Sequence, residues 1–216
     1  MTPALPIPRR PVGGLLLVND ESGKLTAWTR RGLVAVHVTP LGGWTGITPA
    51  SDRSRAAAPY DDPRMALAAR PLPGALRPSI GFFVAGRRGV VVVQPAGWRA
   101  VTRWVVWLPE AGVVHAPGLR AAEPEDLLAF AGAGPRAAPG LQDALAATPG
   151  DALSWLVGIH AALGLPGRDL LMAPEAPVGT LVEPDDDSTA RFDALMREEA
   201  AHLAEVAHPS RRPGGS

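Results

Sequence analysis

Two stretches of this 216-residue chain carry the same order of turn, strand and helix signals. In each stretch an Arg-Arg-Gly turn is followed by a β-branched segment, then a Gly-Trp pair, then an acidic residue and proline that start a helix. The Arg-Arg-Gly turns lie at 30–32 and 87–89, and the Gly-Trp pairs at 43–44 and 97–98. Recurrence of signals in a fixed order indicates an internal repeat. We therefore predict a duplication, with halves of about 13–70 and 78–133.

Each half is predicted to read β-turn-β-turn-β-helix. Turn residues after 15–18 predict a hairpin with 25–29, and β-branched content favours strands elsewhere. The predicted strands lie at 15–18, 25–29, 33–39 and 44–48 in the first half, and at 80–85, 90–94 and 98–108 in the second.

Helix signals mark the end of each half and the region after residue 120. Asp62-Pro63 and Glu123-Pro124 suit helix starts, because the acidic residue faces unpaired amides and proline fits the first turn. A capping sequence at 148–151 predicts a helix that ends at Gly164, with Leu153, Leu156, Ile159 and Leu163 on its apolar face. A last helix is predicted from Ser188 to Ala207, apolar along Phe192, Leu195, Met196, Leu203 and Val206.

These elements predict an α+β fold with a mainly antiparallel sheet from the two repeated units and a helical C-terminal segment. The expected organisation is a flexible proline-rich arm at 1–12, the duplicated domain at 13–135, a helical segment at 136–208 packed on it, and a disordered tail at 209–216. The order of the strands, and whether the halves share one sheet, stay open.

Composition limits the classes of function. The chain has no cysteine, so disulfides and cysteine-based zinc sites are excluded. Its 21 basic residues match 21 acidic ones, which disfavours a nucleic-acid or acidic-membrane partner. Lys24 is the only lysine, a bias typical of a GC-rich bacterial genome. No apolar run is long enough for a signal peptide or a spanning helix, so the cytoplasm is the expected compartment.

Signatures of catalysis or cofactor binding are missing from the sequence, so no catalytic residue, metal site or cofactor is predicted. Glu198, His202 and Glu205 share a helix face, but a di-metal site needs a matching motif that the chain lacks. The acidic run 185–187 is interpreted as a helix cap rather than a cation site. His37, His115 and His160 are isolated and are interpreted as structural.

The paired Arg-Arg-Gly turns supply the first candidate site. Arg31 and Arg88, each beside a second arginine, occupy equivalent places in the repeat and would present two basic tips able to bind carboxylates or phosphates. The alternative is that these arginines are soluble turn residues and the glycines serve the turns.

Trp104 and Trp107 supply the second candidate. They are an odd number of residues apart, so a regular strand places them on opposite faces of the sheet. One of them would then lie outside the core and form a partner-binding surface. The alternative is that helices cover both faces.

The leading functional hypothesis is a non-enzymatic interaction or regulatory protein, which binds a protein partner through the tryptophan-bearing sheet or the C-terminal amphipathic helix. The alternative is a small-ligand-binding protein or enzyme with its site between the halves, collecting Arg31, Arg88 and His115. A third hypothesis, a structural subunit of an assembly, differs from the first only in partner and stoichiometry.

Overall fold

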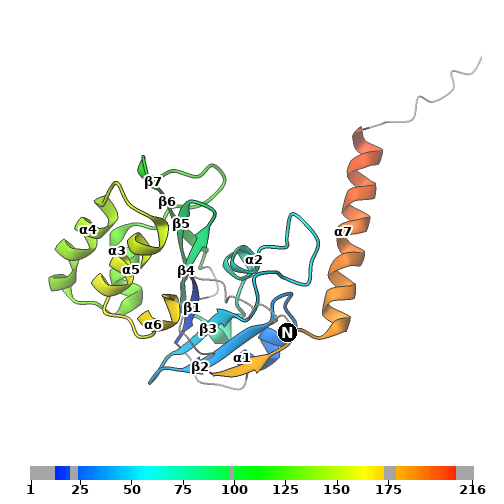
Figure 1. Ribbon diagram of the computed structural model, residues 1–216, viewed down its shortest axis with the longest axis horizontal. Coiled ribbons are helices and arrows are strands. Elements are labelled where there is room, and N and C mark those ends of the chain that lie inside the picture. Colours follow the sequence, from blue (N-terminus) through cyan, green and yellow to red (C-terminus); the bar gives the residue numbers. More distant parts are fainter. Residues whose placement is uncertain (1–12, 20–23, 98–99, 173–178, 208–216) are drawn as a thin grey trace, which may run out of the picture.

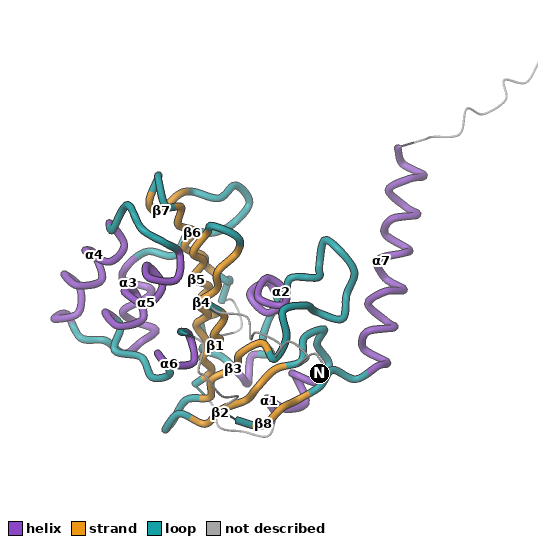
Figure 2. The backbone as a smooth tube through the Cα atoms, viewed as in Figure 1, coloured by secondary structure: helices purple, strands orange, loops and turns teal. Residues whose placement is uncertain are grey.

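The computed structural model describes residues 13–19, 24–97, 100–172 and 179–207 (Figure 1). The predicted arm at 1–12, the tail at 209–216 and Trp98 lie outside these residues. The fold is α+β, as predicted, with an eight-stranded antiparallel sheet between two layers of helices (Figure 2). Within the described part of the chain, no helix has both the length and the apolar character needed to cross a membrane.

All eight strands belong to one sheet, in the order β7-β6-β5-β4-β1-β3-β2-β8, and every neighbouring pair is antiparallel. Both predicted halves therefore contribute to the same sheet, and they meet where β1 pairs with β4. The strands are β1 (Gly14–Val18), β2 (Val36–Pro40), β3 (Thr45–Pro49), β4 (Ser79–Ala85), β5 (Arg88–Gln94), β6 (Arg103–Leu108), β7 (Gly112–Val114) and β8 (Thr180–Val182).

Helices cover both faces of this sheet. One face carries α1 (Lys24–Arg30), α2 (Pro63–Ala69) and the 3₁₀ turn η1 (Gly74–Leu76), and the other carries α3 (Pro124–Ala131), η2 (Pro135–Ala137), α4 (Ala138–Ala146), α5 (Ala152–Ala162) and α6 (Arg168–Leu171). The last helix, α7 (Asp186–Ala207), projects away from the body (Figure 1).

The two-sided cover explains why the central strand β1 is apolar at every position. In β1, Leu15 and Leu17 enter the core beneath α5 and α6, whereas Leu16 and Val18 enter the core beneath α1 and α2. Side chains alternate along a strand, so a strand buried on both faces reads as a continuous apolar run instead of an alternating one.

The predicted hairpin between 15–18 and 25–29 is wrong, because residues 24–30 form α1. Leu25, Trp28 and Thr29 have the spacing of one helix face, and all three are buried. Burying these side chains against the sheet outweighs the weak strand preference of the β-branched and aromatic residues in this segment. The strand predicted over 98–108 is also shorter in the structure, where β6 begins at Arg103.

The internal repeat is not confirmed. The element order is β-α-β-β-α in the first region and β-β-β-β-α in the second. The glycines of the two Arg-Arg-Gly segments also lie in different structural surroundings. Gly32 follows a helix and lies against the Arg70 guanidinium, whereas Gly89 is inside β5, where a β-carbon would collide with the Trp155 ring.

The predicted helix starts are confirmed for α2 and α3. Asp62 accepts a hydrogen bond from the Arg64 amide (2.9 Å), and Asp126 of α3 accepts one from the Glu123 amide (2.9 Å). The next predicted helix, α5, begins later than expected, because Asp151 and not Thr148 caps it. The 136–208 segment, predicted to be helical, also supplies the edge strand β8.

His160 of α5 is a titratable group buried in the core. Its side chain is buried, its ring centroid lies 5.2 Å from that of Phe82, and its Nε2 donates to the Pro166 carbonyl oxygen at 3.0 Å. Burial lowers the pKa of His160 below 6.5, and the nearby Arg168 cation lowers it further, while the hydrogen bond to Pro166 opposes the shift. The unfolded chain therefore binds this proton more readily than the folded one.

We expect the free energy of unfolding to fall as the pH is lowered through about 6.5, the pKa of an unfolded histidine. Because the pKa of His160 is depressed in the folded state, the stability that neutral His160 contributes is fully present above about pH 6.5. This contribution decreases as the pH falls towards the folded-state pKa. Urea unfolding between pH 8 and pH 5, for the wild type and for His160→Gln, measures this slope. If the variant kept the full slope of the wild type in this range, another group would have to be responsible.

Candidate functional site

Trp107 does not form a partner-binding surface. Its side chain is 1% exposed, and its ring stacks on Trp155 of α5 with centroids 5.5 Å apart and planes 11° apart. The indole nitrogen donates to the Ala147 carbonyl oxygen at 3.0 Å. The prediction for Trp107 is therefore corrected: α4, α5 and the loop between them cover it, so it belongs to the core.

Trp104 lies on the opposite face of β6 from Trp107, as the odd spacing predicts. It is partly buried and packs against the core beneath α1 and α2. Its backbone also pairs with the segment after β7, since its amide donates to the Arg120 carbonyl oxygen at 2.8 Å. A binding role for Trp104 stays a prediction.

Arg31 and Arg88 do not occupy equivalent places. Arg88 is exposed at the first residue of β5, whereas Arg31 follows α1 and lines a groove beside α2. Neither Arg88 nor His115 is among the residues that line this groove. The site predicted to collect Arg31, Arg88 and His115 is therefore replaced by one that contains Arg31 and Arg70.

This groove, called the α2 groove below, is a cavity of about 580 Å³. It lies between the end of α1, helix α2, the loop before α2 and the first turns of α7. Its walls are mainly apolar, and they include Val34, Met65, Leu67, Tyr60 and Phe192. Such a volume and lining are typical of sites for small ligands.

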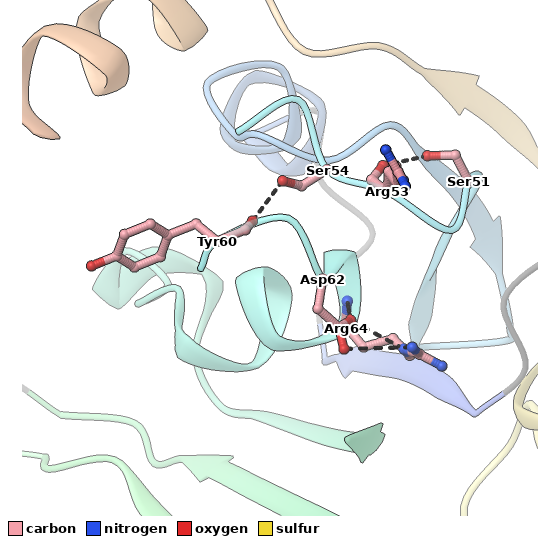
Figure 3. Close-up of polar contacts among 6 residues, drawn as sticks. All are labelled: Ser51, Arg53, Ser54, Tyr60, Asp62 and Arg64. Carbon is pink, nitrogen blue, oxygen red and sulfur yellow. Dashed lines mark hydrogen bonds and ion pairs between the residues drawn. The ribbon is translucent and has the colours of Figure 1, made fainter. Parts of the chain in front are cut away.

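The loop before α2 is shaped by short polar contacts (Figure 3). Ser54 donates from its hydroxyl to the Tyr60 carbonyl oxygen at 2.6 Å, and Ser51 donates to the Arg53 carbonyl oxygen at 2.6 Å. The Ser54 bond holds the backbone of Tyr60, while the Tyr60 ring points away from the loop. The Tyr60 ring then meets Phe192 of α7 edge-on, with centroids 5.3 Å apart.

Arg70 brings a partly buried cation to the α2 groove. Its guanidinium carbon lies 4.0 Å from the centroid of the Trp28 ring, and its Nη2 donates to the Trp28 carbonyl oxygen at 2.6 Å. Burial and repulsion from Arg31 lower the pKa of Arg70 to about 10. Arg70 is therefore still charged at neutral pH, and it stabilises the negative end of α1.

The start of α7 is fixed to the body by Arg55. Its two terminal nitrogens contact Asp186 (2.6 Å) and Glu183 (3.2 Å), and the Asp185 amide donates to the Arg30 carbonyl oxygen at 2.8 Å. The rest of the helix projects away from the body (Figure 1). Leu195 is 56% exposed and Leu203 is 60% exposed, so two large apolar side chains of α7 face solvent.

The carboxylates and the histidine that the sequence marked on α7 and just before it lie outside the α2 groove. The described residues contain no group of three or more histidines and carboxylates placed to hold an ion. In the acidic run 185–187, Asp186 is paired with Arg55. Glu198 and His202 lie on the exposed part of α7.

Sequence reasoning missed Arg70 and Tyr60 as groove residues. Arg70 meets Trp28 across 42 positions of the chain, and no local pattern marks such a pair. Tyr60 sits in a loop whose path depends on Ser54. Phe192 was predicted as part of the apolar face of its helix, but its contact with the loop depends on where α7 leaves β8.

Comparison with known proteins gives no relative from which a role could be transferred. Searches of protein-family models, of curated proteins and of solved structures found no match. A functional inference must therefore rest on the α2 groove and on α7.

Proposed function

We propose that this chain is a non-enzymatic interaction protein of the bacterial cytoplasm, and that α7 is the helix with which it binds a protein partner. The proposal is supported by one observation above all: large apolar side chains on a 22-residue helix remain exposed beyond the body. An isolated helix in water gains little from such side chains, whereas a second helix packed on them would bury them.

Apolar side chains form a stripe along one face of α7, which Glu199 interrupts. Phe192, Leu195, Met196 and Leu203 follow the spacing of one helix face, and Phe192 joins this stripe to the α2 groove. A partner helix lying along α7 would therefore meet the body near Tyr60. This gives the partner a fixed orientation relative to the sheet.

The charge of α7 indicates what kind of partner fits. The helix has six acidic and two basic residues, a net charge of −4 with histidine neutral. A second copy of α7 would bring like charges together, which disfavours self-association. We propose that the partner is a different protein that presents an amphipathic helix with basic residues beside its apolar face.

Photo-crosslinking from α7 tests this proposal. A photoreactive amino acid is placed at Leu195 or Leu203, and in matched controls at Arg197 or Ala201, which lie on the opposite face of the helix at about 100° per residue. We expect one host protein with a basic amphipathic helix to be crosslinked from the first two positions only. Equal labelling from both faces, or crosslinks between copies of this chain alone, would contradict the proposal.

The double substitution Leu195→Asp, Leu203→Asp is expected to weaken binding of the partner. If the two leucines contribute about 1.5 kcal/mol each to the interface, affinity for the crosslinked partner should fall about 100-fold. Because both side chains are exposed, the midpoint of thermal unfolding should not change. An unchanged affinity in a folded variant would exclude α7 as the docking helix.

A further inference from the structure

The α2 groove has an unusual distribution of charge for an apolar cavity. Arg31 and Arg70 both line it, and among the described residues neither forms an ion pair. The two cations repel each other, and Arg70 has also lost part of its hydration. An anion bound between them would relieve both penalties, because it attracts each cation and replaces lost water contacts.

The Arg70 guanidinium is pre-organised for binding such an anion. The Trp28 ring covers one side of the guanidinium, and Nη2 is bound to the Trp28 carbonyl oxygen. A guanidinium has five N–H donors in a plane, and a carboxylate accepts two of them side by side. The residues around Arg70 thus restrict its orientation before any ligand arrives, which lowers the entropy lost on binding.

The acidic residues near the groove set the charge that the ligand can carry. Asp62 lines the groove, where it pairs with Arg64 at 3.1 Å, and Asp185 shares a neighbouring hollow with Arg31. The Asp62 and Asp185 carboxylates weaken the attraction that the two arginines exert on an anion, and burying a dianionic phosphate among apolar side chains costs more hydration free energy than burying a monoanion. The charges therefore favour a single carboxylate.

We propose that the α2 groove binds a small amphipathic molecule that has one carboxylate on an unbranched or weakly branched apolar chain. The carboxylate lies at Arg31 and Arg70, and the chain lies along Val34, Met65, Leu67 and Phe192. The cavity of about 580 Å³ is within the range of about 300–1,000 Å³ that small ligands occupy. This site goes beyond the proposed docking role of α7, because Leu195 and Leu203 are not among the residues that line it.

Isothermal titration with decanoate, and with decanol as the uncharged analogue, tests the proposal on the full chain. We expect saturable one-to-one binding of decanoate and at least tenfold weaker binding of decanol. Arg31→Gln should weaken decanoate binding about tenfold and leave decanol binding unchanged. Arg30→Gln is the matched control, since Arg30 is also exposed and adjacent but does not line the groove.

Each contrary result would overturn the assignment. Equal affinity for decanoate and decanol would show that the arginines do not select the ligand. If Arg30→Gln and Arg31→Gln weakened decanoate binding equally, the effect would come from the net charge of the surface and not from a specific contact with Arg31. Absence of saturable decanoate binding would reject the site. Leu203→Asp should leave decanoate binding intact, so failure of the α7 proposal and failure of this one are distinguishable.

Discussion

Trp107→Ala is expected to lower the free energy of unfolding by about 3–5 kcal/mol, the typical cost of truncating a buried tryptophan. The substitution removes the stack with Trp155 and leaves a cavity beneath α4 and α5. It also removes the hydrogen-bond donor of the Ala147 carbonyl oxygen. Urea unfolding monitored by circular dichroism measures the loss.

Val113→Ala is the control for this prediction. Val113 pairs with Trp107 across β6 and β7, but its side chain is 47% exposed. Its truncation should cost less than about 1 kcal/mol, the span of strand preferences in a host protein. If the Trp107 variant were as stable as the Val113 variant, Trp107 could not belong to the core.

Arg70→Met is expected to destabilise the protein by about 2–5 kcal/mol. The estimate combines a cation–π contact of about 0.5–2 kcal/mol with a charged hydrogen bond of about 1.5–3 kcal/mol. Both contacts join the end of α2 to α1 through Trp28. Methionine keeps the apolar stem, so the loss reports on the guanidinium. Chemical unfolding at pH 7 gives the difference.

Arg31→Gln, at the second arginine of the groove, is expected to leave the free energy of unfolding nearly unchanged. Arg31 is exposed, and its charge lowers the pKa of Arg70 by repulsion. Removing that charge should leave stability unchanged within about 0.5 kcal/mol, or raise it slightly. A large loss in this variant would mean that Arg31 has a structural role, and the ligand measurements on it would need a different substitution.

The α2 groove and α7 are joined at one point, which links the two proposals physically. Phe192 belongs to the wall of the groove and to the apolar stripe of α7. A ligand packed against Phe192 would hold the first turns of α7 against Tyr60. Ligand and partner would then affect each other's affinity by the same factor, as linkage requires.

Local signals predicted part of this fold well. The acidic residue and proline at Asp62 and at Glu123 start α2 and α3, because caps act within one turn of chain. The odd spacing of Trp104 and Trp107 placed them on opposite faces, since alternation is a property of the strand itself. One misassigned segment was 24–30, where weak preferences and turn residues favoured a strand but long-range burial made a helix.

The candidate site was less accessible to sequence reasoning. Arg31 was predicted as a site residue from a repeat that the fold does not confirm, and it lines the groove for a different reason. Arg70, Tyr60 and Phe192 come from separate segments that meet only in the folded chain. No sequence motif surrounds these three residues, so the sequence does not distinguish them from other arginines and aromatic residues.

The sequence by itself determined the α+β class, most strand positions, the capped helix starts and the absence of cysteine chemistry. Each of these depends on residues within a few positions of one another, or on composition. Only the tertiary structure decided that Trp107 is core, that α1 is a helix and that Arg70 faces a groove. These outcomes depend on which distant segments pack together. At these positions the free energy of burying side chains against distant segments outweighs the local conformational preference of the sequence.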